Sequence, residues 1–156
     1  MFRKCSALSV MLVAADGYVR VPGKGLRNLR IYILDSDERS SLLTARMLEE
    51  YTDIDLLGCS GDASPGLQEV ARLEPDAVFI DTKLGCISGL AASERLLREF
   101  PRLHVVYVTA SREYAVEAFE QQAFDYLIKP LTRERLARTV VRLRHSCENA
   151  SRRQDD

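Results

Sequence analysis

Apolar residues in this chain gather into five short, nearly unbroken runs. The runs lie at residues 30–35, 54–59, 76–81, 103–110 and 124–130. They contain segments such as IYIL, VFI and VVYV, in which β-branched and aromatic residues follow one another without polar interruption. This pattern is typical of strands that are buried on both faces. The sequence therefore predicts five strands inside one core.

Segments with helical spacing follow these runs, at residues 39–51, 64–73, 89–100, 112–122 and 132–146. In the first segment, Leu43, Met47 and Tyr51 recur every four residues, which predicts that they share the buried face of a helix. Ser64 and Thr132 precede their segments and are residue types that commonly cap helix N-termini.

The regular alternation of strands and helices predicts the fold class. Consecutive parallel strands joined by helices form right-handed βαβ units, with the helices packed on both faces of the sheet. We expect an α/β domain built on a five-stranded parallel sheet in a doubly wound arrangement. The domain is predicted to span residues 29–145.

Composition agrees with one globular domain. The chain has 156 residues, of which 46% are hydrophobic and 29% charged, and its net charge is −1. This balance gives no basis for direct nucleic-acid binding. Four scattered cysteines without a CxxC pair, together with only two histidines, disfavour a zinc site and a disulfide framework.

The ends of the chain have a different character. Residues 1–28 combine a basic start, the apolar run ALSVMLVAA and a Gly-rich stretch, which we interpret as a poorly ordered leader and linker. A signal peptide is the alternative interpretation; the apolar run is too short to span a bilayer. Residues 146–156 are polar and are expected to form a tail or the start of a linker. The chain is therefore either a fragment of a longer protein or a stand-alone domain.

Acidic, hydroxyl and lysine side chains follow or end the expected strands. Asp35, with Asp37 close behind it, follows the first strand, and Asp81 follows the third. Thr109 ends the fourth strand and Lys129 ends the fifth. In open α/β sheets, working groups gather outside the carboxyl ends of the strands. We therefore expect these five side chains to lie at one edge of the sheet.

This set of groups suits phosphoryl transfer. Two nearby carboxylates would repel each other unless a hard cation such as Mg²⁺ offset their charge. One carboxylate can then attack a phosphoryl group, while the cation and Lys129 neutralise the transferring oxygens. Each residue alone has an ordinary explanation, since an aspartate after a strand commonly forms a turn or a cap. The combination at the ends of successive strands favours chemistry.

These residues, on this alternating pattern, resemble the receiver domains of bacterial two-component response regulators (the CheY-like superfamily). The resemblance covers residues 29–144 and implies strand order 2-1-3-4-5. It implies that Asp81 is the phosphoacceptor, with Thr109 and Lys129 as its catalytic partners. It also implies that Lys129 precedes Pro130 through a cis peptide bond.

The same resemblance implies the metal ligands and the switch. Mg²⁺ would be held by Asp35, Asp81 and the backbone carbonyl of Lys83, with Asp37 as a further candidate. Thr109 and Tyr126 would form the switch, in which the aromatic ring turns inward as the hydroxyl moves toward the phosphoryl group. The segment YVTASREYAVEAFEQQAFDYLIKPL is similar to receivers that precede LytTR-type or bacterial-transcriptional-activator-type domains.

Two positions depart from the family pattern. Ser36 stands where the family usually has the acid that contacts the metal directly, so we predict weaker Mg²⁺ binding and slower phosphorylation. Gly85 stands where proline is usual, which leaves the loop less rigid. A pseudo-receiver, which serves as a phosphorylation-independent interaction module, is therefore the alternative function. A flavodoxin-like cofactor binder is disfavoured because DSDE replaces a glycine-rich phosphate loop.

The expected function is a phosphorylation-activated switch that accepts a phosphoryl group from a sensor histidine kinase. Its only catalysis would be its own phosphorylation and dephosphorylation, and it would act in the cytoplasm without membrane contact. The output would be a partner protein or a C-terminal DNA-binding domain. A homodimer through the fourth helix, fifth strand and fifth helix is also possible. That face carries Phe119 and five arginines, Arg133, Arg135, Arg138, Arg142 and Arg144. The arginines are interpreted first as a solvated helix face, and alternatively as partners of Glu117 and Glu120 across a dimer.

Overall fold

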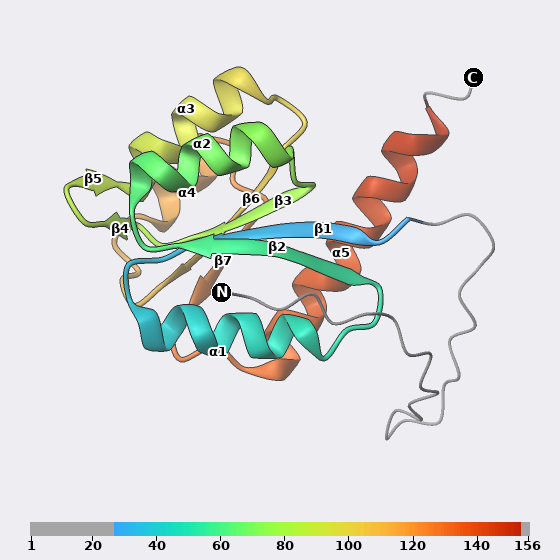
Figure 1. Ribbon diagram of the computed structural model, residues 1–156, viewed down its shortest axis with the longest axis horizontal. Helices are drawn as coiled ribbons and strands as arrows, with labels where there is room; N and C mark the ends of the chain where they lie inside the picture. The colour runs from blue at the N-terminus through green and yellow to red at the C-terminus, as the bar shows by residue number, and fades with distance from the viewer. Residues whose placement is uncertain (1–26, 154–156) are drawn as a thin grey trace.

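The computed structural model describes residues 27–153 and shows one parallel sheet between two layers of helices (Figure 1). The five long strands are β1 (Leu29–Leu34), β2 (Ile54–Ser60), β3 (Ala77–Ile80), β6 (His104–Thr109) and β7 (Asp125–Ile128). They pair in the order β2-β1-β3-β6-β7, and every pair is parallel. The predicted fold class and strand order are confirmed.

Five helices connect and cover the strands. They are α1 (Glu38–Glu49), α2 (Ala63–Leu73), α3 (Gly89–Glu99), α4 (Ala115–Glu120) and α5 (Arg133–Arg152). Helices α1 and α5 pack on one face of the sheet, and α2, α3 and α4 on the other (Figure 1). Each face is an apolar cluster, because successive side chains of every strand point to opposite sides.

A small antiparallel hairpin, β4 (Lys83–Leu84) and β5 (Ile87–Ser88), follows β3 and was not expected from the sequence. Its turn contains Gly85 at φ +61°, a backbone conformation that glycine adopts without steric cost. The hairpin ends at α3, where the Ser88 side chain caps the helix by accepting from the N–H of Ala91 at 3.0 Å. The loop after β3 is thereby held in a fixed shape.

Several expectations about the helices need correction. Leu43 is 42% exposed, whereas Thr44, Ala45 and Leu48 are buried with the predicted Met47. A strict four-residue spacing drifts around a helix of 3.6 residues per turn, so Leu43 rotates away from the core. Ser64 lies inside α2, and Asp62 occupies the N-cap position.

Helix α5 is longer than predicted. Thr132 caps it as expected, but the helix continues to Arg152 through residues that were expected to form a tail. Buried residues Leu136, Thr139, Val140 and Leu143 fix its first half on the sheet. The leader proposed for residues 1–28 lies almost entirely outside the described residues.

Candidate functional site

Asp35 and Asp81 are brought together by neighbouring parallel strands. Each follows the last residue of its strand, and Leu34 of β1 is paired in register with Ile80 of β3. The backbone N–H of Asp81 also donates to the carbonyl of Leu34 at 2.9 Å. The two carboxylates therefore project side by side from the carboxyl edge of the sheet.

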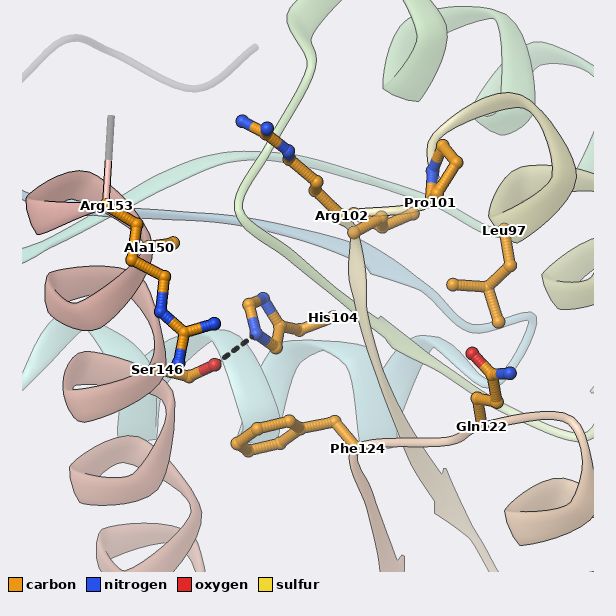
Figure 2. A pocket seen from close by; sticks show the side chains of 10 residues that line it. Leu97, Pro101, Arg102, His104, Gln122, Phe124, Ser146, Ala150 and Arg153 are labelled. Carbon is orange, nitrogen blue, oxygen red and sulfur yellow. Dashed lines mark hydrogen bonds between the residues drawn. The ribbon is translucent and has the colours of Figure 1, made fainter. Parts of the chain in front are cut away.

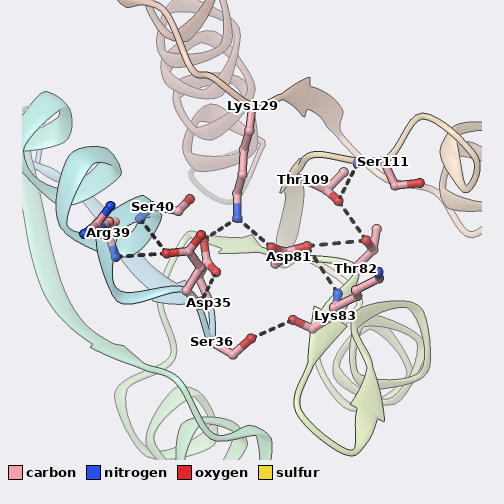
Figure 3. A network of polar contacts seen from close by, with 11 residues as sticks. Asp35, Ser36, Arg39, Ser40, Asp81, Thr82, Lys83, Thr109, Ser111 and Lys129 are labelled. Atoms are coloured by element: carbon pink, nitrogen blue, oxygen red, sulfur yellow. Dashed lines mark hydrogen bonds and ion pairs between the residues drawn. The ribbon is translucent and has the colours of Figure 1, made fainter.

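Lys129 lies between the two carboxylates (Figure 3). Its Nζ is 2.6 Å from Oδ2 of Asp81 and 3.0 Å from Oδ2 of Asp35, and all three side chains are at most 15% exposed. Burial alone would lower the pKa of Lys129, but the hydrogen bonds to Asp81 and Asp35 outweigh it and raise this pKa. The lysine is therefore charged at neutral pH and offsets the repulsion between the carboxylates. The Lys129–Pro130 peptide bond is cis, as the resemblance implies.

The remaining carboxylate oxygens accept from the backbone. Oδ1 of Asp35 accepts from the N–H of Asp37 at 2.9 Å, and Oδ1 of Asp81 accepts from the N–H of Lys83 at 3.2 Å. These bonds hold the two carboxylates in fixed orientations.

The other candidate ligands take different places. The Asp37 side chain caps α1, where its Oδ1 accepts from the N–H groups of Arg39 and Ser40 at 3.0 and 3.2 Å. The Ser36 hydroxyl donates to the carbonyl of Lys83 at 3.2 Å. Ser36 therefore engages the backbone oxygen that the sequence analysis assigns to the metal, and Asp37 is directed to the helix.

The oxygen atoms at this edge fit a magnesium ion chemically. Two carboxylates, one backbone carbonyl and one hydroxyl are hard donors, and Mg²⁺ uses few protein ligands because it retains several waters. Within residues 27–153, no group of three or more His, Cys, Asp or Glu side chains gathers for metal binding. Any ion at this edge would therefore rely on two carboxylates, Asp35 and Asp81, together with the Lys83 carbonyl.

Thr109 ends β6 beside this pair, and a residue missed by the sequence analysis links it to Asp81. The hydroxyl oxygens of Thr82 and Thr109 are 2.8 Å apart, and the Thr82 hydroxyl donates to Oδ1 of Asp81 at 3.4 Å. Both threonines are buried, at 3% and 2% exposure. No local signal marks Thr82, because its role depends on the pairing of β3 with β6.

Tyr126 connects to the same group of residues through Ser111. The N–H of Ser111 donates to Oγ1 of Thr109 at 3.2 Å, and the Tyr126 hydroxyl donates to the carbonyl of Ser111 at 2.6 Å. Tyr126 is 8% exposed, and its ring packs on that of Tyr107 with a centroid distance of 5.7 Å. Burial, followed by the negative charge of Asp81, raises the pKa of Tyr126, which keeps its hydroxyl protonated as a donor.

The arginines of α5 are mostly paired within the chain, rather than simply solvated. Arg135 and Arg142 both bind the buried Asp125, with nitrogen-to-oxygen distances of 2.6 and 3.1 Å. Two further pairs join Arg133 to Glu50 and Arg144 to Asp53. Arg138 is exposed and makes no ion pair with the described part of the chain.

A second hollow lies at the opposite, amino edge of the sheet (Figure 2). There Nε2 of His104 is 2.7 Å from the Ser146 hydroxyl, and Nδ1 is 3.1 Å from the carbonyl of Asp76. Phe124 packs edge-on against His104 with ring centroids 4.9 Å apart. These contacts join α5 to β6, and we assign this region a structural role.

The arrangement of acids, hydroxyl and lysine on this fold agrees with the comparison to known families. Residues 31–141 match the family model of the response regulator receiver domain. The chain belongs to this family. In this member of the family, Asp35, Asp81, Thr109 and Lys129 lie at one edge of a sheet with strand order β2-β1-β3-β6-β7.

Relatives and solved structures agree with this assignment. The receiver is 38% identical over 116 residues to the transcriptional regulatory protein BtsR of Escherichia coli K12, and 39% identical over 115 residues to an uncharacterised response regulatory protein of Yersinia pestis. These matches cover 74% of this chain and 48% of each relative, so the chain spans about half their length.

Two solved structures show the fold. The response regulatory domain of Klebsiella pneumoniae mrkE has a TM-score of 0.72 at 23% identity, covering 77% of this chain and 98% of that one. The response regulator domain of Thermotoga maritima CheB has a TM-score of 0.67 at 19% identity, covering 77% of this chain and 96% of that one.

Within residues 27–153, no helix is both long and apolar enough to cross a membrane.

Proposed function

We propose that this receiver is a phosphorylation-activated switch that takes a phosphoryl group from a sensor histidine kinase onto Asp81. The observation that carries the proposal is the placement of Lys129 between Asp81 and Asp35, at 2.6 and 3.0 Å. A cation held there stabilises negative charge that develops on transferring oxygens. This arrangement is more specific than any strand-end aspartate by itself.

In the proposed reaction, a carboxylate oxygen of Asp81 attacks the phosphorus of a phosphohistidine. An O–P bond forms, the N–P bond breaks with its electron pair going to the imidazole nitrogen, and that nitrogen takes a proton from solvent water. Lys129 remains charged and faces the transferring group, and Thr109 donates to one of its oxygens. A Mg²⁺ ion bound by Asp35, Asp81 and the Lys83 carbonyl would neutralise further charge. Asp37 remains a candidate ligand if its side chain leaves the α1 cap.

The proposed output is a change in the surface formed by α4, β7 and α5. Thr109 would move toward the phosphoryl group, and Tyr126 would follow through Ser111, which bonds to both. Several relatives are named as transcriptional regulatory proteins, which supports control of transcription through a partner or a DNA-binding domain. We place this activity in the cytoplasm, because phosphohistidine donors are made where ATP is present.

We also propose that the active form pairs through the α4–β7–α5 surface. Val116 and Phe119 of α4 are 73% and 53% exposed, and Arg138 of α5 is also exposed. Arg138 can pair with Glu117 or Glu120 of a second copy. Unchanged self-association of phosphorylated Arg138→Glu in analytical ultracentrifugation would remove this part of the proposal.

The central test is incubation with acetyl phosphate and Mg²⁺, followed by intact mass spectrometry. We expect one phosphoryl adduct on the wild-type chain and none on Asp81→Asn. The chain contains no tryptophan, so mass is a more direct readout than fluorescence. An absence of adduct at every Mg²⁺ concentration would favour a phosphorylation-independent interaction module, which the Ser36–Lys83 hydrogen bond also makes plausible.

A further inference from the structure

Thr82 has a buried hydroxyl at the centre of the polar network. Thr82 lies two residues beyond the end of β3 and is 3% exposed, and its Oγ1 is 2.8 Å from Oγ1 of Thr109 and 3.4 Å from Oδ1 of Asp81 (Figure 3). Buried hydroxyls are almost always hydrogen-bonded, so these contacts explain how a polar side chain can be buried at this position. A valine would fill the same space without them.

The two threonines have one hydroxyl proton each, which fixes how they can bond. The N–H of Ser111 already donates to Thr109, and the carboxylate of Asp81 can only accept. If Thr82 donates to Asp81, then Thr109 donates to Thr82 and every group is satisfied. The opposite order would leave the Thr109 proton without one of these acceptors. The order that satisfies every one of these groups runs from Thr109 through Thr82 to Asp81.

This order has a consequence for the switch. Thr109 is the hydroxyl expected to donate to the phosphoryl group, and in this order its only proton is donated to the oxygen of Thr82. Thr109 must break that hydrogen bond before it can donate elsewhere. A bond that exists in one state and not in the other biases the equilibrium between them.

We propose that Thr82 is a positioning residue that restrains Thr109 in the unphosphorylated receiver and so sets the threshold for switching. This inference rests on the proposed function, because it concerns what keeps the switch in its inactive state before phosphorylation. The restraint reaches Tyr126 as well, since Ser111 bonds to Thr109 through its N–H and to Tyr126 through its carbonyl. Release of Thr109 should therefore loosen the anchor of the Tyr126 hydroxyl.

The test compares Thr82→Val, which removes the hydroxyl, with Thr82→Ser, which keeps it. The first readout uses the free protein, without Mg²⁺ or phosphoryl donor. ¹⁹F-tyrosine NMR, with the Tyr126 signal assigned through Tyr126→Phe, reports the environment of the ring. We expect the Tyr126 signal to shift or split in Thr82→Val, because the Thr109 proton must find another acceptor, and to match the wild type in Thr82→Ser.

The second readout is the affinity for beryllofluoride with Mg²⁺, a mimic of the phosphoryl group. Loss of one restraining hydrogen bond should make Thr82→Val bind about threefold to tenfold more tightly, while Thr82→Ser binds like the wild type. A urea denaturation curve for each variant establishes that it is folded. Thr82→Ala removes the same hydroxyl and replaces the valine variant if that one does not fold.

Two results would overturn the inference. An unchanged Tyr126 signal in the free Thr82→Val protein would mean that Thr82 does not restrain this network. Weaker beryllofluoride binding by Thr82→Val would mean that the hydroxyl assists the phosphoryl group instead. Failure of the wild type to bind beryllofluoride or to form an Asp81 adduct would count against the proposed function. In that case the signal from the free protein still decides the role of Thr82.

Discussion

The ammonium group of Lys129 lies 2.6 Å from Oδ2 of Asp81, on a side chain that is only 15% exposed. The same atom bonds Asp35, so one lysine compensates two buried carboxylates. A metal ion at this edge would have to share both carboxylates with Lys129. Lys129 and a metal ion would therefore compete for the same two carboxylates, and this competition can be measured as a change in metal affinity.

Substitution of Lys129 by methionine should lower the stability of the metal-free protein and strengthen Mg²⁺ binding. Two carboxylates would then face each other without compensation, so we expect a loss of stability in the absence of Mg²⁺. Mg²⁺ should bind about tenfold more tightly, which corresponds to ~1.4 kcal/mol. Isothermal titration calorimetry measures the affinity and urea denaturation the stability. Arg138→Met is the control, because it removes one positive charge from an exposed side chain outside the metal site; equal effects in both variants would contradict the prediction.

Ser36→Asp should strengthen metal binding. It places a carboxylate beside the Lys83 carbonyl, which Ser36 now contacts at 3.2 Å. A unit negative charge near a dication at an effective dielectric of ~20 contributes several kcal/mol before desolvation, so we expect at least about tenfold tighter Mg²⁺ binding. Phosphorylation by acetyl phosphate should also accelerate. Ser36→Ala removes the hydrogen bond without adding charge, and a similar gain in that variant would show that the carboxylate is not the cause.

Gly89→Ala should disturb the phosphoacceptor loop. A Cβ at this position would lie 1.9 Å from the backbone oxygen of Asp81, and backbone cannot swing aside as a side chain can. We expect a loss of about 3 kcal/mol in the free energy of unfolding and slower formation of the Asp81 adduct. Gly85→Ala is the comparison: its Cβ meets no atom within 4 Å, but its φ of +61° should cost about 1–2 kcal/mol. A milder effect at Gly89 than at Gly85 would contradict this account.

Asp125→Asn should destabilise the packing of α5. The Asp125 side chain is 5% exposed and binds Arg135 and Arg142, with a further hydrogen bond from Thr139 at 2.8 Å. Asp125→Asn leaves the donors of Arg135, Arg142 and Thr139 without a charged acceptor. Because both arginines are partly exposed to water, we expect only about 2 kcal/mol less stability at pH 7.

The effect of pH on this variant follows from the same contacts. Burial alone would raise the pKa of Asp125, but the bonds from Arg135 and Thr139 lower it below its ordinary value of 3.8. A lowered folded-state pKa stabilises the protein above the ordinary pKa, and this contribution is lost as the pH falls through the lowered value. The difference between wild type and Asp125→Asn should thus be constant near neutrality and shrink below about pH 4. Glu50→Gln, at an exposed pair with Arg133, should leave the denaturation midpoint unchanged, and a constant difference down to pH 2 would refute the linkage.

Local sequence patterns predicted most of the fold. The unbroken apolar runs at β1, β3 and β6, rich in β-branched residues, are typical of strands buried on both faces, so their positions and their polar ends could be read directly. The sequence predicted less well which face of each helix is buried. Leu43 followed the expected spacing but is exposed, since neighbouring elements decide which side of an amphipathic helix is covered.

The sequence by itself determined where β1, β3, β6 and β7 end and that Asp35, Asp81, Thr109 and Lys129 stand at those ends. Only the tertiary structure decided which of their atoms touch. It set Lys129 on both carboxylates, turned Asp37 to cap α1 and placed Thr82 beside Thr109. The physical reason is that strand periodicity is a local property, whereas a contact between β3 and β6 depends on their register, which the packing of the whole sheet fixes.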